Sequence, residues 1–281
     1  MSGTIVFVHG AWVTPESWDA FRKPFEGEGY ETHAPAWPYV GEYSARALNE
    51  APPKGFGSLT LGKIADSYEG FIRALPEEPI IIGHSFGGLL TQMLLDRGCG
   101  RAGVAIDPAP IGGVIPGPSA FAAITPIMLR PAGWKRPYRL SRRRFGKLFA
   151  NTAPPALVDE AYASYVIPAP GMIFHQAALW LGSWVRPAQR RQPLMLTGAT
   201  QDRLVSPYLS RAAYRKQAAC AAATAYKEFE RRSHFLCAEP GWEEVASSII
   251  GWLRANVQDA GLAEIATDFL TDGEFLHGVP A

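Results

Sequence analysis

The chain contains few cysteines. Only three, Cys99, Cys220 and Cys237, occur among its 281 residues. An odd number cannot form a fully paired disulfide framework, and the spacing differs from that of cysteine metal sites. We therefore expect reduced, mostly buried thiols and no metal site.

The sequence also lacks an excess of charge and long hydrophobic runs. Its 27 basic and 26 acidic residues give a net charge of +1, which offers no reason to expect nucleic acid as a partner. No window approaches the roughly 18 apolar residues of a membrane span. Met1 to Thr4 lead into an apolar segment without the basic region of a signal peptide. We expect a cytoplasmic protein with no membrane span.

Short apolar segments alternate with helix-like segments along most of the chain. This pattern predicts an α/β fold, with a mostly parallel, doubly wound sheet of about six strands. The apolar segments are near-continuous runs of Val, Ile and Leu, which are typical of strands buried on both faces. The expected strands are residues 4–8, 31–36, 79–83, 103–106, 193–198 and 224–229. After the first strand, Pro15 is expected to open a helix with Trp18, Phe21 and Phe25 on one face.

Residues 111–187 interrupt this alternation with a segment rich in Pro, Ala, Arg and aromatic residues. A structureless loop of that length is improbable in a compact domain, so we expect a helical cap inserted into the core. The core would comprise residues 1–110 and 188–257, and residues 258–281 would form a helical tail. The basic run at Arg142, Arg143 and Arg144 is expected to be a solvated face.

The third expected strand ends in Gly83-His84-Ser85-Phe86-Gly87, and a helix-forming stretch follows. Gly-x-Ser-x-Gly between a strand and a helix is the layout of a nucleophile elbow, which exposes a serine hydroxyl above a sheet. Glycines two residues before and after Ser85 would let the strand and the helix pack closely. Ser85 is therefore the candidate nucleophile.

A serine nucleophile needs a base and an acid that orients it. Of the six histidines, His234 alone lies in the loop between the last strand and the last helix, where active sites of open α/β sheets assemble. Asp202, after the fifth strand, is the first candidate for the acid, and Asp107, at the end of the fourth, is its rival. The oxyanion donors should be the backbone N–H groups of Phe86 and Ala11.

Together these motifs resemble the α/β-hydrolase superfamily. The resemblance lies in residues 9–12, 83–88 and 233–235 and in the loop that bears Asp202, and it covers about residues 4–110 and 190–257. It implies a triad of Ser85, His234 and Asp202, with no cofactor. The family usually has two more strands ahead of the one that ends in His-Gly, so we expect a sheet that lacks them.

Ser85 limits the reactions that this resemblance implies. Relatives that open epoxides or displace halide carry aspartate in place of Ser85, so those activities are disfavoured. Ester hydrolysis is the commonest activity in the family, so hydrolysis of a carboxylic ester is the first prediction. A C–C bond hydrolase or a lyase on the same fold is the alternative, followed by a non-catalytic ligand-binding protein. The substrate is expected to be a small ester with a hydrophobic acyl group, and a homodimer is possible. Candidates for substrate contacts are Trp12, Tyr162, Tyr165, Met172 and Phe174.

Overall fold

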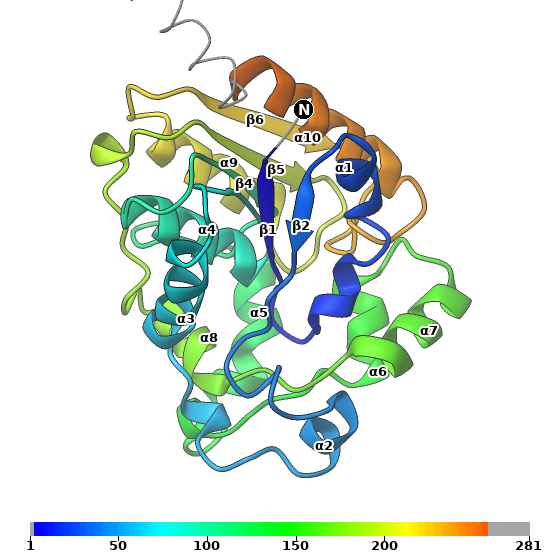
Figure 1. Ribbon diagram of the computed structural model, residues 1–281. Helices are drawn as coiled ribbons and strands as arrows, with labels where there is room; N and C mark the ends of the chain where they lie inside the picture. Colours follow the sequence, from blue (N-terminus) through cyan, green and yellow to red (C-terminus); the bar gives the residue numbers. More distant parts are fainter. Residues whose placement is uncertain (1–2, 258–281) are drawn as a thin grey trace, which may run out of the picture.

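Six strands form one parallel sheet in the order β2-β1-β3-β4-β5-β6 (Figure 1). The computed structural model describes residues 3–257. The strands are β1 (Thr4–Val8), β2 (Glu31–His33), β3 (Ile80–His84), β4 (Ala102–Ile106), β5 (Leu194–Ala199) and β6 (Thr224–Phe229). The predicted six-stranded α/β fold is thus confirmed. The second strand is shorter than predicted and ends at His33, three residues before the expected end at Ala36.

Helices and helical turns account for most of the remaining chain. They are η1 (Pro15–Trp18), α1 (Lys23–Gly27), α2 (Ala45–Glu50), η2 (Phe56–Ser58), α3 (Leu61–Arg73), α4 (Phe86–Asp96), α5 (Pro118–Met128), η3 (Gly133–Lys135), α6 (Arg142–Arg144), the π-helical η4 (Phe145–Phe149), α7 (Pro155–Tyr165), α8 (Gly171–Ala178), η5 (Pro187–Gln189), α9 (Pro207–Gln217) and α10 (Trp242–Asn256). In the described part of the chain, no helix combines the length and hydropathy that crossing a bilayer requires. The predicted tail, residues 258–281, lies outside the described residues.

The core lies in two layers, one on each face of the sheet. Alternate residues of β1 divide between them, because successive side chains of a strand point to opposite faces. Ile5 and Phe7 pack with α1 and α10 in one layer, whereas Val6 and Val8 pack with α3, α4 and α9 in the other. Strands β1, β3, β4 and β5 are buried along their whole length, as the apolar runs predict for a sheet covered on both faces.

The segment after β1 forms two short pieces rather than the single helix predicted from Pro15. A 3-10 turn ends at Trp18, and α1 begins at Lys23. The three aromatic residues of the predicted stripe, Trp18, Phe21 and Phe25, are all buried in the layer on the α1 and α10 side. Ring contacts between them and Phe7 hold the segment. The hydrophobic pattern therefore identified the buried face correctly but not the continuity of the helix.

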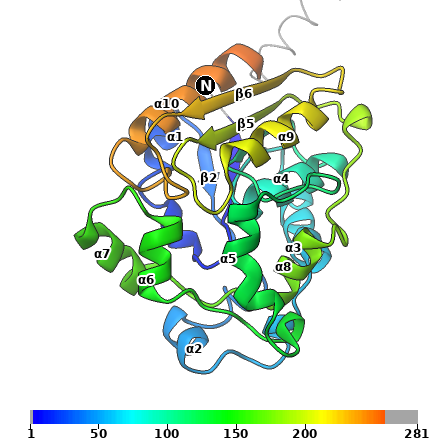
Figure 2. The ribbon, with the colours of Figure 1, turned by 180° about the vertical axis from the view of Figure 1, so that it is seen from behind.

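Helices α5 to α8 lie beyond the carboxyl ends of the strands (Figures 1 and 2). This segment is joined to the turn after β1 at several backbone atoms. The Thr14 N–H donates to the Tyr165 carbonyl, and the Ile167 N–H donates to the Trp12 carbonyl. The indole N–H of Trp12 donates to the carbonyl oxygen of Tyr138 at 3.0 Å. Trp12 therefore connects the sheet to the helices above its carboxyl edge.

Candidate active site

Ser85 occupies a strained turn between β3 and α4. Its backbone has φ 57° and ψ −120°, a left-handed conformation that costs a non-glycine residue free energy and is concentrated at functional sites. The two glycines of the motif make the turn possible, since a Cβ on Gly87 would lie 1.9 Å from the Val8 carbonyl oxygen. A Cβ on Gly83 would lie 2.1 Å from the Gly87 carbonyl oxygen. The structure thus has the close approach of strand and helix that the sequence predicts.

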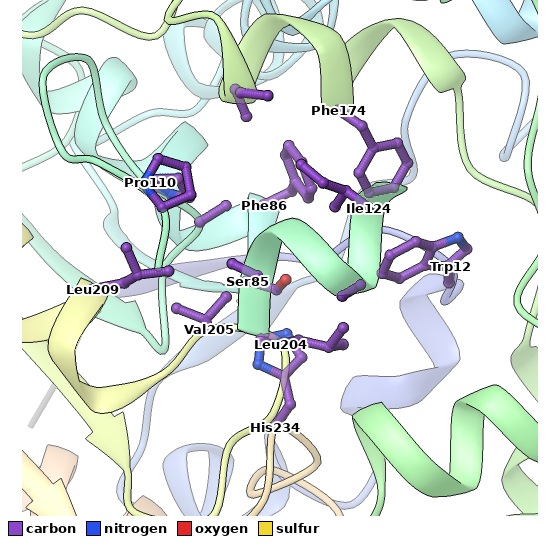
Figure 3. Close-up of a pocket in the computed structure, with 16 residues that line it drawn as sticks. Trp12, Ser85, Phe86, Pro110, Ile124, Phe174, Leu204, Val205, Leu209 and His234 are labelled. Atoms are coloured by element: carbon purple, nitrogen blue, oxygen red, sulfur yellow. The ribbon is translucent and has the colours of Figure 1, made fainter. Parts of the chain in front are cut away.

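His234 lies in the loop between β6 and α10 and is completely buried. Its Nδ1 atom is 2.5 Å from Oδ2 of Asp202. A carboxylate accepts hydrogen bonds, so Nδ1 carries the proton and Nε2 of the neutral ring carries the lone pair. Nε2 is buried and has no hydrogen-bond partner among the described residues. His234 and Ser85 line the same cavity (Figure 3). Nε2 of His234 is therefore a candidate for the base that a serine nucleophile needs.

Asp202 follows β5 and is held by three donors. Its Oδ1 atom accepts from the backbone N–H groups of Leu204, at 2.7 Å, and Val205, at 2.8 Å. Its Oδ2 atom accepts from His234. Burial raises the pKa of the Asp202 carboxyl, and the two backbone donors oppose that rise. The pKa is raised overall to about 8, and the donor set limits that rise and fixes the direction in which the carboxyl faces the imidazole.

Asp107, the rival acid, lies close to this pair but does not bond to the histidine. It is fully buried, and its Oδ1 accepts a hydrogen bond from Thr197 Oγ1 at 2.9 Å. Oδ2 of Asp107 has no partner in the described part of the chain. Burial and the neighbouring Asp202 carboxylate raise the pKa of Asp107 well above its usual range. Of two carboxyls that cannot both ionise, the one with fewer donors keeps the proton, so Asp107 is the neutral member.

The side chains of Asp107, Asp202 and His234 each offer an atom within 4.8 Å of the others, as ligands of a metal ion could. Two of the three side chains, Asp202 and His234, are instead hydrogen-bonded to each other, and Asp107 accepts from Thr197. Both oxygens of Asp202 and Nδ1 of His234 already take part in hydrogen bonds. A cation would have to displace those contacts.

Aromatic rings enclose the imidazole of His234. The His84 ring lies 4.6 Å from it between centroids, and the Phe149 ring lies 4.8 Å away in an edge arrangement. Burial lowers the pKa of His234 below its ordinary value of 6.5. Burial and the proximity of His234 also lower the pKa of His84. Both rings are therefore neutral at pH 7, and His84 is a neighbour that the sequence analysis did not identify.

Glu239 supports the loop that carries His234. Its buried carboxylate accepts from the Ser233 backbone N–H at 2.7 Å and from the Ser233 hydroxyl at 2.6 Å. The Thr152 hydroxyl donates to the same side chain. Glu239 therefore joins the histidine loop to the segment between η4 and α7. Its position five residues after a histidine gave no signal in the sequence.

The two predicted oxyanion donors are the N–H groups of Ala11, in the turn after β1, and of Phe86, the residue after Ser85. Phe86 is the first residue of α4, so its N–H has no partner within the helix. Neither group donates to another described residue. His9 braces the Ala11 turn, since its Nδ1 bonds the Gly10 carbonyl at 2.9 Å and its Nε2 accepts from the Trp37 N–H at 3.2 Å. Its ring also stacks on Trp37, as expected of a residue that braces a loop.

An apolar cavity of about 60 Å³ lies over Ser85 (Figure 3). Trp12 stacks on Phe174 at 4.7 Å, and Phe86 meets Phe174 edge-on at 5.1 Å. Apart from Ser85 and His234, every lining residue is apolar: Trp12, Phe86, Ala109, Pro110, Pro116, Ala120, Ala123, Ile124, Phe174, Ala177, Ala178, Leu204, Val205 and Leu209. The cavity can therefore accept an apolar group next to the serine hydroxyl.

Of the five residues considered for substrate contacts, the structure brings Trp12 and Phe174 to this cavity. Tyr162, Tyr165 and Met172 are not among its lining residues. The Tyr162 hydroxyl instead donates to the Leu140 carbonyl, and the Tyr165 ring lies near that of Phe235. The lining that the sequence analysis missed comes mainly from alanines of α5 and α8 and from the loop after Asp202.

The sequence matches the model of one protein family, and the structure is similar to many solved structures. A model of the alpha/beta hydrolase family matches residues 5–247, whereas no curated protein matches the sequence. The structure is similar to a monoacylglycerol lipase of Paleococcus ferrophilus, with a TM-score of 0.66, 20% identity and coverage of 90% of this chain and 94% of that one.

Two plant structures are similar to the same extent. A methylesterase from Arabidopsis has a TM-score of 0.66 and 12% identity and covers 89% of this chain and 98% of its own. Tomato methylketone synthase I, complexed with 2-tridecanone, has a TM-score of 0.67 and 15% identity, and the match covers 91% of this chain and 99% of that one. At these identities the likeness concerns the fold.

Proposed function

The chain belongs to the alpha/beta hydrolase family, and we propose that it is a serine hydrolase of carboxylic esters with Ser85, His234 and Asp202 as its triad. The observation that carries the proposal is the bond between Asp202 and Nδ1 of His234. Nε2 of that ring has no partner among the described residues, and His234 lines the same cavity as Ser85, which supports Nε2 as the base. A serine hydroxyl needs such a base to become nucleophilic at neutral pH.

In the proposed mechanism, Nε2 of His234 takes the hydroxyl proton as Ser85 Oγ attacks the ester carbonyl carbon. The N–H groups of Ala11 and Phe86 donate to the oxyanion, a contribution that typically amounts to 10²–10³-fold per donor, about 3–4 kcal/mol. His234 then gives its proton to the leaving alkoxide as the carbon–oxygen bond breaks. It next takes a proton from a water molecule that attacks the acyl carbonyl carbon. As the bond between that carbon and Ser85 Oγ breaks, His234 gives the proton to Oγ, and the carboxylic acid leaves. Asp202 keeps the Nδ1 tautomer and stabilises the imidazolium without taking its proton.

The apolar cavity supports an ester whose acyl group is hydrophobic. A pocket selects apolar groups when burial removes them from water, at about 25 cal/mol per Å². The cavity lacks the lysine that a hydroxynitrile lyase would need, since neither Lys135 nor Lys147 is among its lining residues. The arrangement therefore favours ester hydrolysis over lyase chemistry.

Hydrolysis of p-nitrophenyl acetate and butyrate tests the proposal. The wild-type protein should release p-nitrophenol from both esters, and Ser85→Ala should reduce kcat at least about 10³-fold while leaving the fold intact. Thr91→Ser, a buried hydroxyl on α4 away from the cavity, is the matched control and should retain activity. A wild-type protein inactive on esters of every chain length would contradict the proposal.

A further inference from the structure

A second, wider groove lies beside the active-site cavity, between α5 and the α6–η4 turns. We name it the cationic groove. Its volume is about 650 Å³, and its lining residues are Ala122, Ala123, Ser141, Arg143, Arg144, Lys147, Leu148 and Arg203. Figure 2 shows α5 and α6 as neighbouring elements on this side of the molecule. Three of the lining residues are apolar and four are cationic, so the groove presents both hydrophobic and charged side chains.

The charge of the groove is one-sided although the chain as a whole is nearly neutral. Four cationic side chains line it, and no Asp or Glu does. Arg142, which precedes them, is paired with Asp159 and does not line the groove. Arg143, Arg144, Lys147 and Arg203 have no acidic partner among the described residues. Nine arginines of the described chain lie in ion pairs, whereas none of the three arginines that line the groove does.

Two of the four cations are held in place by backbone oxygens. Arg144 Nη2 donates to the Ala123 carbonyl at 2.8 Å, and Arg203 Nη1 donates to the Lys147 carbonyl at 3.4 Å. Arg143 and Lys147 are four residues apart on one helical stretch, a spacing at which like charges repel. Bringing these cations together costs free energy that a bound anion would recover.

The groove adjoins the reacting groups. Ala123 lines both the groove and the active-site cavity. Arg203 lies between Asp202, which pairs with His234, and Leu204, which lines the cavity. Because the groove and the cavity share Ala123, and Leu204, the next residue after Arg203, lines the cavity, the two sites adjoin.

From this juxtaposition we infer that the cationic groove is a subsite for an anionic group of the substrate, and that the natural ester carries a carboxylate in addition to the bond that is cleaved. The inference rests on the proposed function for the position of the scissile ester. Guanidinium groups bind carboxylates through paired N–H donors, and Arg143 and Arg203 are the exposed arginines able to do so. Ala122, Ala123 and Leu148 would contact the hydrocarbon chain that joins the two ends.

A matched pair of substrates tests the inference. The p-nitrophenyl monoester of glutaric acid carries a free carboxylate, and p-nitrophenyl butyrate does not, although both release the same phenol. The double variant Arg143→Gln/Arg203→Gln should lower kcat/KM for the glutarate monoester about tenfold through KM, since each exposed ion pair contributes modestly. Its kcat/KM for butyrate should stay within about twofold of wild type. Added salt should weaken the preference of wild type for the monoester.

Arg191→Gln serves as the control, because Arg191 is exposed, precedes β5 at the opposite edge of the sheet and has no ion pair among the described residues. It should change neither rate. Equal losses on both esters in the double variant, or no loss on either, would overturn the inference.

Calorimetry separates this inference from the proposed function. Ser85→Ala is titrated with monoethyl glutarate, which is anionic, and with diethyl glutarate, which is neutral. Tighter binding of the monoester, abolished by adding Arg143→Gln and Arg203→Gln, supports the subsite even if wild type hydrolyses no ester. Hydrolysis of butyrate without any preference for the anionic ligand would leave the proposed function standing and refute the subsite.

Discussion

The Oδ2 atom of Asp202 lies 2.5 Å from Nδ1 of His234, and both side chains are inaccessible to solvent. A second carboxyl, that of Asp107, lies within 4.8 Å of this contact. The two carboxyls differ in their donors, because Asp202 accepts from two backbone N–H groups as well as from the imidazole. That difference decides which one stays charged beside the histidine.

Asparagine substitutions should therefore separate the roles of the two carboxyls. We expect Asp202→Asn to lower kcat by about 10³–10⁴-fold, because an amide at this position favours the wrong imidazole tautomer. Asp107→Asn replaces a neutral acid by a neutral amide of the same shape and should lower kcat less than about tenfold. Steady-state kinetics on p-nitrophenyl butyrate measure both, and the opposite ranking would assign the role of the acid to Asp107.

The pH dependence follows from the buried state of His234. Its pKa is lowered by burial, so the free base persists below pH 6.5 and is lost only as the pH falls through the lowered value. We expect kcat/KM to be flat between about pH 7 and 8 and to decline at a pH below the ordinary histidine pKa of about 6.5. A decline that begins above pH 7 would mean that protonation of a different group controls the rate. The profile of Asp107→Asn should coincide with that of wild type if Asp107 is neutral throughout.

Glu239 is expected to stabilise the loop that carries His234 and to take no part in the reaction itself. Glu239→Ala removes the acceptor of three hydrogen bonds and should lower the free energy of unfolding by about 3 kcal/mol, since bonds to buried charges are stronger than neutral ones. Glu243→Ala, an exposed substitution on α10, is the control and should change stability by less than about 0.5 kcal/mol. Urea denaturation measures both. Equal stability of the two variants would mean that Glu239 does not anchor the loop.

Filling the cavity should shift the preferred ester length. Ala177 lines the cavity from α8, and Ala177→Leu adds three carbon atoms to its wall. Because the cavity measures only about 60 Å³, kcat/KM for p-nitrophenyl butyrate should fall about tenfold or more while that for acetate changes less. Ala163→Leu, an exposed substitution on α7, should alter neither. A uniform loss on both esters by Ala177→Leu would indicate distortion of α8 instead of a filled pocket.

Much of the fold was predictable because its signals are local. Ile80, Ile81 and Ile82 form a β-branched run bounded by turns, and they are fully buried in β3. The glycines at 83 and 87 mark the elbow by sterics alone. The apolar run and the Gly-x-Ser-x-Gly spacing each lie within about five positions, so the sequence is sufficient to reveal them, although the contact that excludes a side chain at Gly87 is with Val8 of β1.

The remainder depends on contacts between distant segments. Glu239 meets Thr152 across 87 residues, and Asp107 meets Thr197 across 90. Neither pair leaves a pattern in the sequence. The cavity wall was missed for a related reason, because Ala120, Ala123 and Ala177 have the spacing of any helix core. Large aromatic residues were predicted to form that wall. One of them, Tyr162, instead donates its hydroxyl proton to the Leu140 carbonyl oxygen.

Covalent labelling shows whether Ser85 is the nucleophile. The wild-type protein is incubated with a p-nitrophenyl alkylphosphonate, and the adduct is located by mass spectrometry of the digested chain. We expect one phosphonyl group per chain, on Ser85, with release of one equivalent of p-nitrophenol from wild type and none from Ser85→Ala. Absence of an adduct on wild type, or an adduct on another residue that persists in Ser85→Ala, would contradict it.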